Sequence, residues 1–162
     1  MFNEIEEFKE ILDNEKFKSL DKYIAHGKTS IMKHSILVAE LGLKMIDKFK
    51  LKVNKAEFVK SALLHDFYFY DWRKAPKYIG LHGFSHPRIA ADNAKATFGI
   101  NDREYANILS HMWPLTIRKL PKTGEGALLC IADKICTVRE VLGMCPKCEK
   151  NNEVCHHYFC CN

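Results

Sequence analysis

Histidines and aspartates at the edges of apolar segments are the residues of this chain best suited to chemistry. Two of them, His65 and Asp66, are adjacent at the end of the apolar stretch AEFVKSALLHD. Imidazole and carboxylate groups both bind divalent transition metals. A buried carboxylate is unfavourable unless a cation or several hydrogen-bond donors satisfy it. The pair therefore indicates a metal site, although an aspartate that accepts hydrogen bonds at a helix end would explain half of it.

A further candidate ligand, His34, lies inside an amphipathic pattern. It is about one turn from both Ile31 and Leu37, so it faces inward on a helix. A single inward histidine is also compatible with a hydrogen-bonded core residue. The presence of other candidates elsewhere in the chain favours a ligand.

Asp133 lies in the apolar run GALLCIADKICTVREVLG. Ile131, Val138 and Leu142 are part of a broad apolar stripe in this run, which predicts that the stripe is buried. A carboxylate beside such a stripe needs a cation or several donors. Lys134 is the alternative partner in sequence, but neighbouring residues on a helix point in different directions.

His86 and His111 complete the candidate set, each at an expected helix end. Ser85 is placed to cap a helix that ends at Gly99, with Pro87 in its first turn. His86 then lies at a helix N-terminus, where the helix dipole favours a neutral imidazole that can bind metal. A separate helix is expected to stop at His111.

Apolar residues at three- and four-residue spacing predict the helices that position these side chains. These helices are expected over about residues 2–12, 17–24, 31–49, 54–66, 85–99, 102–111 and 126–143. Strand patterns are poor throughout the chain. The predicted fold class is all-α.

Composition bounds the protein class. With 162 residues, 47% hydrophobic and 28% charged, the chain is typical of one globular domain, over residues 1–143, followed by a Cys/His-rich tail over residues 144–162. The net charge of +5 comes from scattered lysines, so no nucleic-acid surface is indicated. No run reaches the ~20 apolar residues of a membrane span, and no signal peptide pattern is present. The cytoplasm is the expected location.

Cysteines fall into two sets. Cys130 and Cys136 lie in the last apolar run, where a free cysteine acts as a small core residue. The others crowd into the tail and could hold a structural zinc ion. The candidate tail ligands are Cys145, Cys148, Cys155 and Cys160. A frayed, redox-sensitive tail is the alternative.

The ordered set H…HD…H…H…D resembles the HD superfamily of metal-dependent phosphohydrolases. The local segments KHSILVAELG, ALLHD, SHPRIAADNA and LLCIADKI support this resemblance. LHGFSHP and HMWPLT are similar to a small, largely uncharacterised bacterial subgroup, and the GYP signature of cyclic di-GMP enzymes is absent. The resemblance implies an HD-domain helical bundle that binds one or two divalent ions of iron, manganese, nickel or zinc. It implies one ion on His34, His65, Asp66 and Asp133, and a second on Asp66, His86 and His111.

The resemblance also implies a reaction. The expected activity is that of a phosphomonoesterase, phosphodiesterase or pyrophosphohydrolase acting on a nucleotide or other small phosphorylated compound. A metal-bound hydroxide would be the nucleophile, with His65 and Asp66 as catalytic residues. The candidate substrate contacts are His82, Arg88, Lys134, Trp72 and Arg73, for which a surface position is the alternative. A non-catalytic metal- or nucleotide-binding sensor and a diiron oxygenase are the competing functions, and the sequence does not set the oligomeric state.

Overall fold

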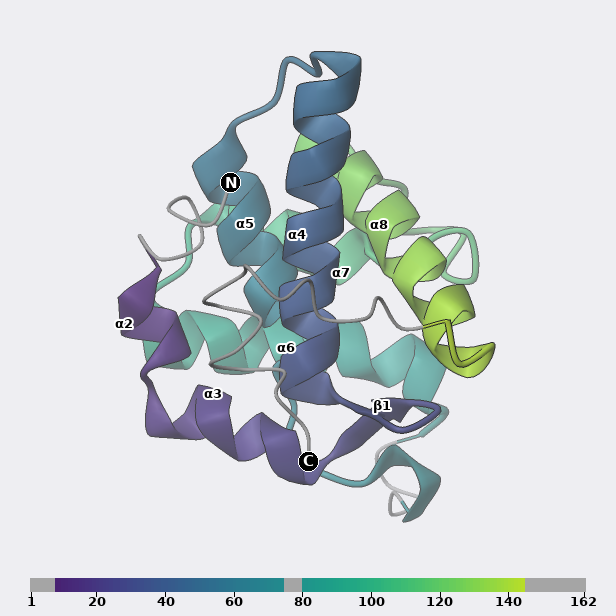
Figure 1. Ribbon diagram of the computed structural model, residues 1–162. Helices are drawn as coiled ribbons and strands as arrows, with labels where there is room; N and C mark the ends of the chain where they lie inside the picture. Colours follow the sequence, from purple (N-terminus) through teal and green to yellow (C-terminus); the bar gives the residue numbers. More distant parts are fainter. Residues whose placement is uncertain (1–7, 75–79, 145–162) are drawn as a thin grey trace.

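The computed structural model describes residues 8–74 and 80–144, which form a helical bundle with one short β-hairpin (Figure 1). In chain order the elements are α2 (Lys9–Leu12), α3 (Glu15–Ser19), the 3₁₀ turn η1 (Leu20–Lys22), β1 (Ile24–His26), β2 (Thr29–Ser30), α4 (Ile31–Phe49), α5 (Lys55–Leu64), the 3₁₀ turn η2 (Trp72–Lys74), α6 (His82–Phe98), α7 (Asp102–Ser110) and α8 (Gly124–Val141). The all-α prediction is confirmed. The helix predicted over residues 17–24 is wrong at its end, because the helical turns stop at Lys22 and Ile24 begins β1. The antiparallel pair β1 and β2 was not predicted, because strands of three and two residues are too short to show an alternating pattern.

The long helix α4 forms the centre of the bundle, with α5 and α8 on either side of it (Figure 1). Capping residues set where α4 and α5 begin. The side chain of Ser30 accepts a hydrogen bond from the backbone of α4, and that of Asn54 does the same for α5. Gly42 lets the two helices approach closely, because a Cβ there would collide with the ring of Phe58. The predicted range 31–49 for α4 is confirmed.

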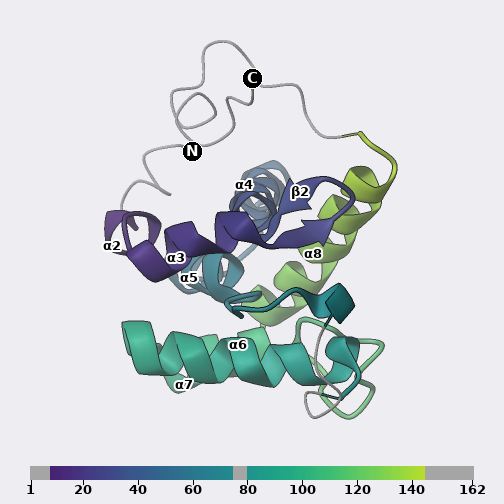
Figure 2. The same ribbon diagram turned by 90° about the horizontal axis from the view of Figure 1, so that it is seen from below.

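Helices α6 and α7 pack side by side as a second layer, seen below the other helices in Figure 2. The predicted start of α6 at residue 85 is wrong, since α6 begins at His82 and contains Pro87. The N-cap Leu81 offers no capping side chain, so the sequence carries no start signal there. Ser85 instead donates from Oγ to the carbonyl of Leu81, at 3.1 Å.

Helix α8 packs against α4, α5 and α7 and so joins the two layers. Its buried face includes Leu129, Cys130 and Cys136, which confirms the cysteines as core residues. The prediction that the whole apolar stripe is buried is wrong. Ile131, Val138 and Leu142 are 50%, 56% and 66% exposed, because the layers cover only one side of the helix.

Two further predictions concern membrane-spanning helices and the zinc ligands of the tail. Within the part of the chain that the structure describes, no helix combines the length and apolar character needed to cross a bilayer. The proposed zinc ligands of the tail lie outside the described residues; they are Cys145, Cys148, Cys155 and Cys160.

Candidate metal centre

The six predicted ligands converge in the interior, although they come from five different segments. His34 lies on α4, His86 on α6 and Asp133 on α8, while His65 and Asp66 directly follow α5 and His111 directly follows α7. Each of the six is at most 6% exposed. The fold thus brings all of them together at the junction of the two helical layers.

One group of donors surrounds Asp133, and we call it the His34 group: His34, His65, Asp66 and Asp133. His34 Nε2 lies 3.2 Å from Asp133 Oδ1. His65 Nε2 lies 3.8 Å from the same oxygen and 3.8 Å from Asp66 Oδ2. The ligand atoms of His34, His65 and Asp66 all lie within 4.8 Å of one another, close enough to share one ion.

A second group adjoins it, which we call the His111 group: Asp66, His86 and His111. Asp66 Oδ1 lies 3.3 Å from His86 Nε2 and 3.7 Å from His111 Nε2. The two Nε2 atoms are 2.9 Å apart. These three ligand atoms could also hold an ion. Asp66 therefore belongs to both groups, with one carboxylate oxygen directed to each.

Backbone carbonyls fix the orientation of three of the histidine rings. The Nδ1 atoms of His65, His86 and His111 donate to carbonyls at 2.8, 2.7 and 2.7 Å. The acceptors are Ala62, His82 and Ile108. A carbonyl can only accept, so Nδ1 carries the proton and a neutral ring presents the Nε2 lone pair to Asp66. Such a bond on the far nitrogen is typical of metal-binding histidines.

His34 is oriented by a carboxylate instead, that of Glu140. His34 Nδ1 lies 3.0 Å from both carboxylate oxygens of Glu140, which is 5% exposed. Glu140 was missed in the sequence, although a signal was available: it follows Asp133 by seven residues and so lies two turns further along the same helix face.

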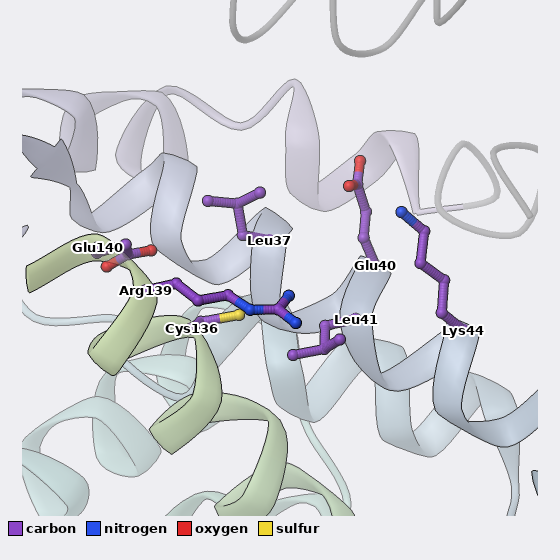
Figure 3. Close-up of a pocket in the computed structure, with 7 residues that line it drawn as sticks. All are labelled: Leu37, Glu40, Leu41, Lys44, Cys136, Arg139 and Glu140. Atoms are coloured by element: carbon purple, nitrogen blue, oxygen red, sulfur yellow. The ribbon is translucent and has the colours of Figure 1, made fainter. Parts of the chain in front are cut away.

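The outer side of Glu140 faces a small groove along the seam between α4 and α8 (Figure 3). Leu37, Leu41 and Glu40 from α4 and Arg139 from α8 line it. Its volume is about 50 Å³, which is room for ordered water rather than a substrate. The groove therefore lies on the side of the cluster where Glu140 contacts His34, and it is too small for a substrate.

Charge is distributed unevenly over the cluster. Burial lowers the pKa of His34, but hydrogen bonds with Asp133 and Glu140 outweigh it and raise the pKa to about 10. Burial raises the pKa of Asp66 and Asp133, yet the neighbouring histidines hold both well below the ordinary value. In the His111 group, burial and the charges of His86 and His65 lower the pKa of His111 to about 3.

Two buried atoms of the cluster, His65 Nε2 and Asp66 Oδ1, have no hydrogen-bond partner among the described residues. Leaving such atoms unsatisfied costs on the order of 1–3 kcal/mol each. A divalent cation would satisfy both, and mixed imidazole and carboxylate donors suit iron, manganese, nickel and zinc. The residues present therefore fit a metal ion.

A cavity of about 570 Å³ opens over the cluster. Asp66, His86, His111 and Asp133 form part of its wall, and apolar groups such as Leu115 form another part. A volume of this size is in the range of small-molecule sites.

Three of the predicted substrate contacts line this cavity: Trp72, His82 and Lys134. Lys134 Nζ donates to the carbonyls of His111, at 3.0 Å, and Cys130, at 3.3 Å. The ring of His82 is stacked between Trp72 and His86, with centroids 5.5 and 4.3 Å away.

The other two, Arg73 and Arg88, are not part of the cavity wall. The Arg73 guanidinium lies over the Trp72 ring, 5.6 Å from its centroid. Arg88 Nη1 donates to the hydroxyl of Tyr105 at 3.2 Å. A cavity residue that the sequence did not single out is His26, whose ligand atom lies within 4.8 Å of those of His34 and Asp133.

Comparison of the chain with protein-family models, with curated proteins and with solved structures gives no significant match.

Proposed function

We propose that this protein is a metal-dependent phosphohydrolase of the HD type, acting on a small phosphorylated compound such as a nucleotide. The observation that carries the proposal is the pair of buried, unpartnered atoms His65 Nε2 and Asp66 Oδ1 beside a cavity of about 570 Å³. Asp66 lines that cavity, so a cation satisfying these atoms would also be within reach of a ligand.

The order of the ligands supports the HD assignment. The chain supplies them as His34, His65-Asp66, His86, His111 and Asp133, each from a separate helix or helix end. Asp66 directs its two oxygens to different groups, as expected of a carboxylate shared by two ions. This arrangement supports a site for one or two divalent cations.

A divalent cation, when bound, supplies a Lewis acid that lowers the pKa of coordinated water and neutralises phosphoryl charge. The chain's own part is to orient the donors and exclude other nucleophiles. Carbonyl partners hold the Nε2 atoms of His65, His86 and His111 toward Asp66. Burial raises the pKa of Cys130 and, to about 12, that of Cys136. Neither of these two thiols is a thiolate near neutral pH, so neither is suited to act as a nucleophile.

Lys134 favours a phosphoryl group as the part of the substrate nearest the cluster. An ammonium group has three donors, and two of those on Lys134 are bound to the carbonyls of His111 and Cys130. The third is available to a phosphoryl oxygen in the cavity that Lys134 lines. Among the described residues, Lys134 is the only lysine or arginine in that wall.

The experiment that tests the proposal is a hydrolysis screen of protein purified without oxygen and loaded in turn with Mn²⁺, Fe²⁺, Ni²⁺ and Zn²⁺. Nucleoside monophosphates, cyclic and linear phosphodiesters, nucleoside polyphosphates and p-nitrophenyl phosphate form the panel. We expect release of phosphate or cleavage of a diester that Asp66→Asn abolishes.

The competing outcomes are distinct. If wild type and Asp66→Asn are equally inert across the panel while the wild type binds metal, the protein is a metal-binding module and the proposed function is wrong. Product formation that requires oxygen would point to oxygenase chemistry instead.

A further inference from the structure

His26 stands outside the ligand set on which the proposed function rests. It is the last residue of β1 and lines the same cavity as Asp66 and Asp133. Its ring meets that of His34 edge-on, with centroids 5.0 Å apart and an angle of 77° between the planes. The ligand atoms of His26, His34 and Asp133 lie within 4.8 Å of one another. His26 therefore borders the His34 group from the hairpin side.

The backbone around His26 is held on both sides. Before it, the carbonyl of Ala25 accepts a hydrogen bond from Trp72 Nε1 at 3.2 Å. After it, Gly27 has φ +56° and lies so close to α8 that a Cβ would be 2.7 Å from the carbonyl oxygen of Glu140. Only glycine tolerates both the left-handed backbone and this approach. Figure 2 shows the hairpin seated beside the end of α8. The position of the His26 ring thus follows from a fixed frame.

The bond between His34 and Glu140 decides how many ions can bind beside His34. Glu140 occupies His34 Nδ1, so only Nε2 remains for a metal. Nε2 faces Asp133 at 3.2 Å. His34 belongs both to the triad with His65 and Asp66 and to the triad with His26 and Asp133, and with Nδ1 engaged it can serve either triad only through Nε2. Because one imidazole nitrogen binds one ion, both triads describe a single site.

A structural role for the His26 ring has little support. Within the described part of the chain, no side-chain hydrogen bond engages its nitrogens. By contrast, the other histidines of the cluster each have one nitrogen bound to a carbonyl or carboxylate. A ring nitrogen of His26 is therefore available to a ligand beside His34 and Asp133.

We propose that His26 is a fifth protein ligand of the ion in the His34 group, alongside His34, His65, Asp66 and Asp133. This inference rests on the metal site of the proposed function and extends it. Five protein ligands exceed the four of a tetrahedral zinc site. His26 therefore favours an ion that accepts a larger coordination number, such as Mn²⁺ or Fe²⁺, and leaves less of that ion open than in a four-ligand site.

The test is Co²⁺ titration of the full-length, chelator-treated protein, followed by its visible absorption spectrum. His26→Ala removes the ring, and His26→Phe keeps the aromatic contact with His34 while removing both nitrogens. Lys28→Ala, an exposed change in the same hairpin, is the matched control. Any Co²⁺ held by the tail cysteines is common to all four proteins, so differences between them report on the cluster.

We expect both His26 variants to bind Co²⁺ at the His34 group at least about tenfold more weakly. Tenfold is the lower end of the loss in metal affinity when only a residue behind a ligand is changed. Their visible bands should shift while Lys28→Ala matches the wild type. Unchanged affinity and spectrum in folded His26→Phe, checked by circular dichroism, would overturn the proposal. Failure of the proposed function looks different: Co²⁺ binding would still depend on His26, but no compound in the hydrolysis panel would be cleaved.

Discussion

His34 and His111 are equally buried and lie in the same cluster, yet their pKa values move in opposite directions. Asp133 and Glu140 flank His34 and raise its pKa to about 10 against the effect of burial. Burial and the neighbours His86 and His65 lower the pKa of His111 to about 3. The difference arises from the neighbours, because burial alone lowers the pKa of both.

This contrast shows how the two halves of the cluster, the His34 group and the His111 group, differ as cation sites. The His34 group has its own carboxylate, Asp133, and a further one behind it, Glu140. Among the described residues, the one carboxylate of the His111 group is Asp66, which it shares with the His34 group. Negative charge attracts a cation more strongly in a poorly solvated interior. We therefore expect the His34 group to bind the tighter ion and the His111 group the weaker one.

The largest effect is expected from Asp66→Ala, because it removes a ligand from both halves at once. Metal content measured by mass spectrometry after dialysis should fall at both sites. Changing a residue that only hydrogen-bonds a metal ligand weakens metal binding by up to about 100-fold. Because Asp66 is itself a ligand, the loss of affinity should be larger than that. Asp102→Ala, on a side chain that is 95% exposed, is the control and should keep full metal content. Retention of one tight ion in Asp66→Ala would show that the halves do not share this carboxylate.

A smaller change is expected from His111→Ala, which removes a ligand from the His111 group alone. Calorimetric titration with Mn²⁺ should lose the weaker binding event and keep the tighter one. If the tighter event disappears instead, the assignment of affinities to the two halves is reversed.

Glu140→Gln tests the carboxylate behind His34. Glutamine can still accept a hydrogen bond from His34 Nδ1 but lacks the charge, so the tighter ion should bind about tenfold more weakly. Glu40→Gln is a matched control, because Glu40 lines the same groove (Figure 3) and is not bonded to His34. Equal titration curves for the two variants would exclude a role for Glu140 in metal binding.

The smallest effect concerns the stability of the metal-free protein across pH. The pKa of His34 is raised from 6.5 to about 10, so its stabilising effect is complete below pH 6.5 and is lost as the pH rises to about 10. The pKa of His111 is lowered from 6.5 to about 3, so stability is lost as the pH falls from 6.5 toward 3. Stability should therefore be greatest near the ordinary histidine pKa.

Thermal melting with a chelator present measures this dependence. Other groups also titrate, so the informative quantity is the difference between the wild type and each variant. His34→Gln should flatten the alkaline side, and His111→Gln the acid side. In each variant, the change of melting temperature across its pH range should differ from that of the wild type by at least about 3 °C. This is the shift that about 1 kcal/mol causes in a chain of this size. Parallel curves for all three proteins would contradict the opposed pKa shifts.

Local signals explain which parts of the fold could be predicted. Ser30 and Asn54 cap helices through bonds to residues three positions away, and α4 has a strong apolar periodicity. The predicted start of α6 was wrong because the side chain of its N-cap, Leu81, makes no capping hydrogen bond. The prediction that Ile131 is buried failed for another reason. Periodicity shows which residues share a helix face, but not how much of that face the other helices cover.

By itself, the sequence determined most of the helical frame and the six candidate ligands, because residue type and helical periodicity are local properties. It did not place His86, which lies inside α6 and not at its start. Only the tertiary structure decided which atoms meet. It set Glu140 behind His34 and carried His26 to the cluster on a hairpin, contacts between residues far apart in the chain. It also gave two equally buried histidines opposite pKa shifts, since those depend on charges that reach each ring through folding.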